Sequence, residues 1–171
     1  MNVEAALAPP LVGFRFQVVF RAEPFTGTGG DPVPLCQGAF AECTGLEASM
    51  EAFAIREGGA NYGEAQRIGT TSFATVVFKR GMTRSRDLWT FFHLVAGGGY
   101  AQRLTATVEM FDHAGAGVLA WTLRRALPVK FKVADLAATA TEAAVEELHC
   151  VHEGFIENDD PPAGLFAGPP S

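Results

Sequence analysis

Hydrophobic and polar residues alternate with a period of two through most of the chain, and this pattern predicts β-strands. The alternation is clearest in residues 14–21, where four apolar positions share one face, and in residues 104–110. Strands are predicted over residues 14–21, 40–55, 73–80, 104–110, 118–125, 129–133 and 145–155. Residues 112–117, rich in glycine, predict a hairpin turn. Strands with one apolar and one polar face are typical of antiparallel sheets.

One segment departs from this period and predicts an α-helix over about residues 86–96. Its apolar side chains follow helical i, i+3, i+4, i+7 spacing: Leu88, Phe91, Phe92 and Val95. Ser85 is the predicted N-cap, Asp87 places a negative charge in the first turn, and the glycines at 97–99 end the helix. About seven strands and one helix predict a mainly β fold, a small antiparallel β-barrel or sandwich with one flanking α-helix.

The length of 171 residues fits a single domain. We expect residues 1–13 to form an N-terminal extension and residues 14–156 to form the β domain. Residues 23–34 contain several glycines and prolines and predict a loop inserted between two strands. Residues 157–171 lack an apolar period and contain four prolines, so we expect a mobile C-terminal tail.

Composition removes several classes of function. The net charge of −6 argues against a nucleic-acid-binding protein, which needs a basic face. There is no run of 18 apolar residues, so we expect no membrane span, and the N-terminus lacks the pattern of a secretory signal. The three cysteines, Cys36, Cys43 and Cys150, have no CxxC spacing. We therefore expect reduced cytoplasmic thiols rather than disulfides or a zinc site.

The candidate catalytic residues do not form a recognisable constellation. His149 and His152 are three residues apart in a predicted strand, so they point to opposite faces and cannot bind one metal ion together. Glu146 and Glu147 are adjacent and face opposite sides, and no GxSxG motif is present. We therefore expect no enzymatic activity, no catalytic or metal-binding residues and no cofactor.

Two polar features call for a further explanation. Polar side chains line one face of two predicted strands: Glu47, Ser49 and Glu51 in the first, and Thr105, Thr107 and Glu109 in the second. Each stripe is either the solvated face of an antiparallel sheet or the wall of a water-filled ring. The polar loop of residues 56–63 is either a free hairpin loop or a docking loop that orders on a neighbouring subunit.

A series of short motifs resembles one known family. The segments are F-A-E-C-T-G-L-E at 40–47, F-A-I-R-E-G-G at 53–59, V-F-K-R-G-M-T at 77–83, A-L-P-V-K at 126–130, E-A-A-V-E-E-L at 142–148 and H-E-G-F at 152–155. In their order and spacing they resemble the tail tube proteins of contractile phage tails and of phage-tail-like contractile injection systems. The resemblance covers roughly residues 14–156.

The resemblance implies a structural function. Members of the family form hexameric rings that stack into a hollow inner tube within a contractile sheath, tipped by a spike at the baseplate. It also implies a small β-barrel with one flanking helix, related to the type VI secretion tube protein, in which strands of neighbouring subunits join into a barrel that lines the lumen. We expect assembly in the cytoplasm and a particle that is either a virion or a released injection device.

Specific residues follow from this resemblance. The expected subunit-interface loop contains Arg56, Glu57, Gly58, Gly59, Asn61 and Tyr62. The expected lumen-facing residues are Glu47, Ser49, Glu51, Thr105, Thr107 and Glu109. The longer loop at 23–34, the extra tail and the Cys43-Thr44 pair depart from the commonest family pattern. They leave open whether the chain is the main tube subunit or a paralogue next to the spike and baseplate.

Two other classes of function remain open at this point. A monomeric ligand-binding β-barrel would enclose an apolar cavity and would remain a monomer in solution. A hydrolase or transferase on a β-sandwich would need a convergent polar site, which the sequence does not contain.

Overall fold

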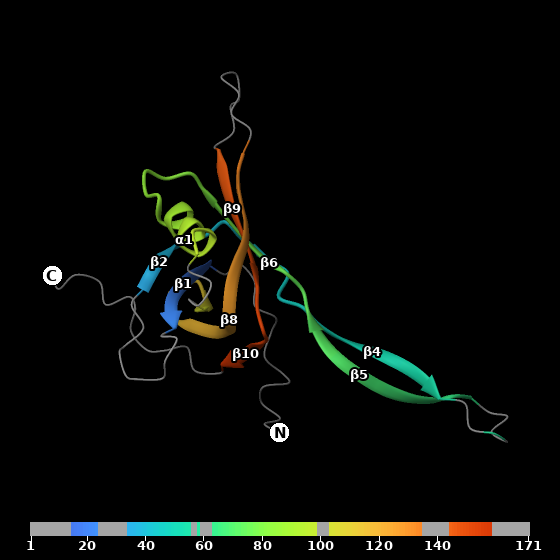
Figure 1. Ribbon diagram of the computed structural model, residues 1–171. Coiled ribbons are helices and arrows are strands. Elements are labelled where there is room, and N and C mark those ends of the chain that lie inside the picture. Colours follow the sequence, from blue (N-terminus) through green and yellow to red (C-terminus); the bar gives the residue numbers. More distant parts are fainter. Residues whose placement is uncertain are drawn as a thin grey trace.

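The computed structural model describes residues 15–23, 34–55, 58, 63–98, 103–134 and 144–158 (Figure 1). These residues form a mainly β fold with antiparallel strand pairing and one α-helix, as the sequence predicts. The elements are β1 (Arg15–Glu23), β2 (Pro34–Ala39), β3 (Glu42–Thr44), β4 (Ala48–Ile55), β5 (Ala65–Phe73), β6 (Val76–Gly81), α1 (Asp87–Ala96), β7 (Arg103–Phe111), β8 (Gly117–Val133), β9 (Val145–Val151) and β10 (Phe155–Asn158).

The long strand β8 joins two halves of one sheet, whose strand order is β2-β1-β7-β8-β9-β6-β3. The first half of β8 pairs with β7 and β10, and its second half, from Leu127 to Val133, pairs with β9. We call the second half of β8, together with β9, β6 and β3, the β9 sheet. The first half of β8, together with β10, β7, β1 and β2, is the β1 sheet. Arg125 has a φ of 51° between the two halves. The sequence predicted separate strands at 118–125 and 129–133, whereas the structure has one strand that bends there.

The core lies between the two sheets and the helix. In β6, β7 and β9 every second side chain points inward. Phe20 of β1 meets Phe78 of β6 with ring centroids 5.1 Å apart in an edge-on arrangement. The helix contributes the buried side chains of Leu88, Phe91 and Val95, three of the four predicted by the helical spacing. Burial of each large side chain of this kind stabilises the fold by about 1.5–3 kcal/mol. The helix therefore closes the open side of the sheets, as its amphipathic pattern predicts.

The helix starts differently from the prediction. Arg86 occupies the N-cap position and makes no side-chain capping bond, so the predicted N-cap at Ser85 is wrong. Asp87 takes over part of this role, because its Oδ1 accepts the backbone N–H of Leu88 at 3.0 Å. Gly97 ends the helix as predicted, and its N–H donates to the carbonyl of His93.

Several strand boundaries also differ from the prediction. The single strand expected at 145–155 is two strands, β9 and β10, separated by residues 152–154, where Gly154 has a φ of 142°. Strand β10 continues to Asn158, two residues past the expected end of the domain. Strands β2 and β5 were not predicted. The N-terminal extension, most of the inserted loop at 23–34 and the tail beyond Asn158 lie outside the described residues.

Candidate assembly surface

The hairpin of β4 and β5 extends far from the rest of the molecule (Figure 1). We call it the β4–β5 arm. Register pairs run from Ala48 opposite Phe73 to Ile55 opposite Ala65, with a bulge between Met50 and Ala52. Almost every side chain in both strands is exposed, including Met50 at 61% and Ile68 at 69%. A two-stranded hairpin that buries neither face is at best marginally stable in water.

Apolar side chains lie on both faces of the arm. Ile68 is the register partner of Ala52, which lies two residues after Met50 in β4, so Met50 and Ile68 lie on one face. Phe53 and Ile55 lie on the other face. The Phe53 ring covers Gly69, where an added Cβ would lie only 2.5 Å from Phe53 Cε2. Large apolar groups exposed together typically mark a surface that binds a partner. The arm is therefore the strongest candidate for an assembly surface among the described residues.

The root of the arm has a defined geometry. Gly45 has a φ of 87°, and a Cβ there would lie 2.2 Å from the carbonyl oxygen of Thr75. Only glycine fits this close approach without displacing the backbone. The bend predicted from Thr44-Gly45 is thus confirmed, and it directs the chain from β3 into the arm.

Aromatic rings support the arm at its base. Phe73, the last residue of β5, lies 5.4 Å from the His152 ring and 6.0 Å from Phe155, measured between ring centroids. The N–H of Gly154 donates to His152 Nδ1 at 3.2 Å and fixes the orientation of the imidazole. This cluster connects the arm to the break between β9 and β10.

The predicted interface loop connects β4 to β5 along the chain. Of its six residues, only Gly58 is described, and it is exposed in a turn; Arg56, Glu57, Gly59, Asn61 and Tyr62 lie outside the described residues. Gly63, where the chain returns toward β5, has a φ of 86°. The role of this loop in subunit contacts stays a prediction.

The six predicted lumen residues fall into two separate places. Ser49 and Glu51 are exposed on the arm, on the face that also carries Phe53, and Glu47 is exposed at its root. Thr105 and Thr107 are half-buried on the outer face of the β1 sheet, where they border a recess of about 370 Å³ with Arg21 and Thr122. These two polar stripes do not form one surface in the isolated subunit.

Glu109 differs from the other predicted lumen residues. Its side chain is buried, and Gln17 Nε2 of the adjacent strand β1 donates to its Oε2 at 2.5 Å. The two residues are direct register partners in the pairing of β1 with β7. Glu109 therefore forms a polar contact within the subunit that strand alternation alone does not reveal. It also lines the recess beside Thr105 and Thr107, and its place in the lumen stays a prediction.

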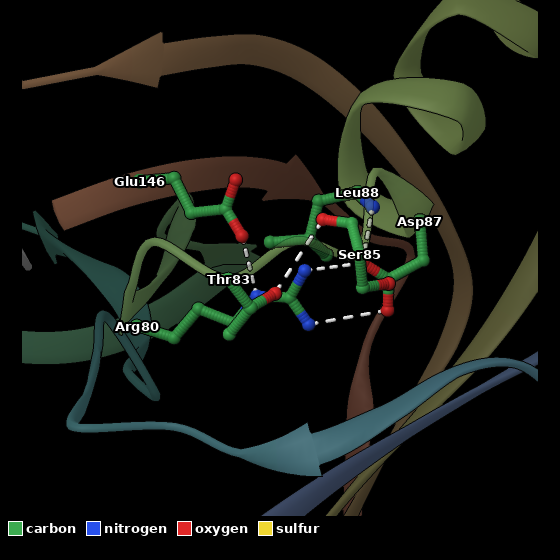
Figure 2. Close-up of polar contacts among 6 residues, drawn as sticks. All are labelled: Arg80, Thr83, Ser85, Asp87, Leu88 and Glu146. Atoms are coloured by element: carbon green, nitrogen blue, oxygen red, sulfur yellow. Dashed lines mark hydrogen bonds and ion pairs between the residues drawn. The ribbon is translucent and has the colours of Figure 1, made fainter.

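A buried ion cluster anchors the start of the helix (Figure 2). Arg80 of β6 donates from Nε to Glu146 Oε1 at 2.5 Å and from Nη1 to Asp87 Oδ2 at 3.1 Å, and Nη2 also bonds Asp87 Oδ1. Arg80 and Glu146 are nearly inaccessible to solvent. Because its planar guanidinium engages two carboxylates at once, Arg80 joins β6, β9 and α1. The sequence analysis did not identify this cluster.

The remaining chemical features are two described cysteines, Cys43 and Cys150. Burial raises the pKa of the Cys43 thiol to about 12, and burial also raises the pKa of Cys150. Neither thiol forms the reactive thiolate at neutral pH. The described residues contain no group of three or more potential metal ligands. No helix within the described ranges combines the length and hydropathy needed to cross a bilayer.

Solved structures share this fold. A chain of the anti-feeding prophage (AFP) baseplate superposes with a TM-score of 0.75 at 24% identity, covering 89% of this chain and 97% of that chain. The AFP tube-terminating cap gives 0.70 at 18% identity, with 94% and 100% covered. The sheath–tube complex of an extracellular contractile injection system, PVC, in the extended state gives 0.68 at 18% identity, with 94% and 99% covered.

Sequence comparison identifies the family. A search of curated protein sequences gave no match. The family described as "T4-like virus tail tube protein gp19" matches residues 12–156, which include nearly all of the described fold. This chain therefore belongs to the T4-like virus tail tube protein gp19 family.

Proposed function

We propose that this chain is a structural subunit of the inner tube of a phage tail or contractile injection system. Six copies form a ring, the rings stack around a hydrophilic channel, and a contractile sheath surrounds the tube. The role is mechanical and requires neither catalysis nor a cofactor. Assembly takes place in the cytoplasm, and the particle is either a virion or a device released from the cell.

The exposed arm is the observation that carries this proposal. Its two strands present apolar side chains on both faces and bury neither against their own domain. Such a hairpin becomes stable when other copies of the subunit cover it. Ring formation supplies those copies, because a head-to-tail interface places the arm of each subunit against its neighbour.

The structural relatives support a proposal for the proteins that contact this chain in the tube. One of them is part of a sheath–tube complex, and another is part of a baseplate. We propose sheath, spike and baseplate proteins as partners, together with other tube paralogues. The glycine- and proline-rich segment at 23–34 supports a position next to the spike or baseplate, because an inserted loop there would alter the packing between rings.

The oligomeric state of the purified chain tests the proposal. We expect rings of six subunits in size-exclusion chromatography with light scattering, and stacked tubes in negative-stain micrographs at high concentration. A protein that remains monomeric at all concentrations, and is absent from sedimented particles, would refute the proposal.

A charge exchange tests the loop that connects β4 to β5. We propose that residues 56–63 bridge neighbouring subunits within or between rings, because Arg56 and Glu57 offer one charge of each sign. The double change Arg56→Glu and Glu57→Arg keeps the net charge and should block tube assembly while the monomer remains folded. Normal tubes from this variant would contradict the role of the loop.

The interior of the subunit does not favour the alternative of a ligand-binding barrel. Large side chains fill the described space between the sheets and the helix, among them Phe20, Phe78, Leu88 and Leu148, each fully buried. A small barrel filled in this way has no room for a ligand.

A further inference from the structure

The root of the β4–β5 arm meets the bend of β8 and the break between β9 and β10 at one point, which we call the junction. Two backbone hydrogen bonds connect the bend to the break. The N–H of Arg124 donates to the carbonyl of Gly154 at 2.8 Å, and the N–H of Glu153 donates to the carbonyl of Arg124 at 3.1 Å. A Cβ added to Gly154 would lie 3.5 Å from Cζ of Phe73, the last residue of β5. The arm therefore packs directly on the junction.

His152 contacts both the arm and the junction. The centroid of its ring lies 5.4 Å from that of Phe73 and 5.9 Å from that of Phe155. Its Nδ1 accepts the N–H of Gly154 at 3.2 Å, so the neutral ring carries its proton on Nε2. Nε2 is buried and has no hydrogen-bond partner among the described residues. The neutral ring thus uses its acceptor and leaves its donor unpaired.

A second proton on the ring would remove that acceptor. Both nitrogens of an imidazolium carry hydrogens, so Nδ1 would present a hydrogen to the N–H of Gly154 instead of accepting from it. Nε2 would gain nothing, because it has no acceptor within the described part of the chain. The faces of Phe73 and Phe155 attract a cation, but this attraction leaves the N–H of the buried Gly154 without a partner. Protonation therefore opposes the observed arrangement of the junction.

Charged groups on the surrounding elements do not compensate for that loss. They are exposed, and no hydrogen bond or ion pair joins them to His152 in the described ranges: Glu47 at the root of the arm, Arg124 and Arg125 of β8, Glu153 at the junction and Glu157 of β10. Glu153 forms its ion pair with Arg125, at 2.8 Å. On β9, His149 lies 3.3 Å from Glu147, and burial raises the pKa of the Cys150 thiol, which stays neutral.

We propose that His152 is a pH switch at the root of the β4–β5 arm. In the closed state the neutral ring holds Gly154 in the conformation on which Phe73 packs. In the open state the ring is protonated, the hydrogen bond to Gly154 is broken and the arm loses this support. The half-buried side chain remains within reach of solvent protons.

The direction and size of the pH effect follow from proton linkage. A free histidine side chain takes up a proton at about pH 6.5. Because the open state binds a proton that the closed state does not, the closed state is favoured at neutral pH and is lost as the pH falls. The ratio of open to closed arms should rise about tenfold between about pH 7.5 and about pH 5.5.

Hydrogen exchange measured by mass spectrometry tests the switch in the full chain, below the concentration at which tubes form. Peptides that cover residues 65–76 and 152–158 report on the root of the arm and on the junction. We expect their protection to fall about tenfold between about pH 7.5 and about pH 5.5, after correction for the slower intrinsic exchange in acid. Near-UV circular dichroism at both pH values establishes that the rest of the fold is retained.

Two substitutions of His152 separate proton uptake from packing. His152→Asn keeps an acceptor oxygen in place of Nδ1 and does not titrate, so its protection should not depend on pH. His152→Leu keeps an apolar side chain without an acceptor, so its protection should be low at both pH values. His149→Asn is the matched control on β9 and should show the same fall as wild type.

Sedimentation of tubes at the two pH values tests the consequence for assembly, which rests on the tube-subunit function proposed above. If the arm contacts other copies, we expect wild-type protein to need about tenfold more subunit to form tubes at about pH 5.5 than at about pH 7.5. Tubes of His152→Asn should form at the same concentration at both pH values.

The exchange experiment alone decides whether the switch exists. A fall in protection for wild type and His149→Asn, but not for His152→Asn, supports it. Equal protection of wild type at both pH values, or an equal fall in His152→Asn, overturns it. If wild-type protein forms no tubes at any pH, the proposed function fails and the exchange result still decides the switch. Tubes that form equally well at both pH values while the junction opens would refute the effect on assembly.

Discussion

Arg80 is the residue whose loss we expect to be most damaging to the fold. It joins two carboxylates, Glu146 and Asp87, at a site with almost no solvent access. Arg80→Ala would leave the Glu146 charge buried without a partner, which typically costs about 3–5 kcal/mol. We expect a loss of that size in the free energy of unfolding, measured by urea titration. Arg125→Ala, which breaks the exposed pair with Glu153, is the control and should cost no more than about 1 kcal/mol. Equal losses for the two variants would contradict this assignment.

Gly45 sets the direction of the arm through its backbone conformation. Gly45→Ala would place a Cβ against the Thr75 carbonyl at a positive φ. We expect a destabilisation of about 1–3 kcal/mol or a displaced arm, because a strained backbone costs that much. Thermal unfolding and the NMR shifts of residues 74–76 would reveal either effect. Gly81→Ala is the matched control, since nothing lies within 4 Å of its added Cβ. If both changes are neutral, the close approach at Gly45 has no energetic importance.

At the scale of elements, the sequence predicted those strands that have one buried face. Strands β1 and β7 alternate cleanly because each lies between a core and a polar surface. Strand β5 contains no such alternation, since neither of its faces is buried within the subunit, and it was not predicted. Strand β2 begins at a proline and contains a glycine, both unfavourable in strands, and it forms through pairing with β1. Where the local sequence pattern is weak, pairing with a neighbouring strand therefore determines whether a strand forms.

The candidate site was predictable only in part, for a related reason. Short motifs located the family. The ion cluster of Arg80 and Glu146 joins residues 66 positions apart, and Gln17 contacts Glu109 across 92 positions. No local pattern reports such distant contacts. The sequence also did not identify the exposed apolar residues of the arm, such as Ile68. Their exposure becomes evident only in the folded subunit, where Ile68 is 69% exposed.

The arm is the element on which we expect assembly to depend most. Ile68→Lys changes a side chain that is 69% exposed, so the monomer should keep its unfolding free energy within about 0.5 kcal/mol. In the assembled ring, the same lysine would be buried against an apolar neighbour, at a cost that prevents association. We expect a folded monomer and loss of tubes in sedimentation assays. Leu94→Lys, at an apolar position of α1 that is 44% exposed, is the control, and tubes from Ile68→Lys as abundant as those of wild type would exclude the arm from the interface.

At the scale of the whole molecule, the isolated subunit leaves two features incomplete. The arm has uncovered apolar faces, and the outer strands of the β9 sheet, β3 and the second half of β8, each pair with one neighbour among the described strands. Either feature alone is common on protein surfaces. We expect a closed ring of identical subunits to complete both, because each surface finds its complement on the next copy.

Assembly should also determine which residues form the wall of the channel. We predict a hydrophilic and acidic wall that includes Glu47, Ser49 or Glu51, with Thr105 and Thr107 as further candidates. Glu109 accepts a hydrogen bond from Gln17 and lines the same recess as Thr105 and Thr107, so it stays a candidate with them. Like charges repeated around a ring repel one another, but water and salt screen them over a Debye length of about 8 Å. A wall without apolar patches would let cargo pass without adhering to it.

Thiol labelling of assembled tubes tests this arrangement. Ser49→Cys, in a chain whose Cys36 is replaced by serine, carries one exposed thiol beside the half-buried Cys43 and the buried Cys150. If the side chain faces the channel, a small maleimide should label it in tubes, whereas a bulky polymer-linked maleimide should label it only in free subunits. Equal labelling of tubes by both reagents would place Ser49 on the outer surface. A density map of the tube with Glu47 and Glu51 facing the sheath would refute the assignment for the arm.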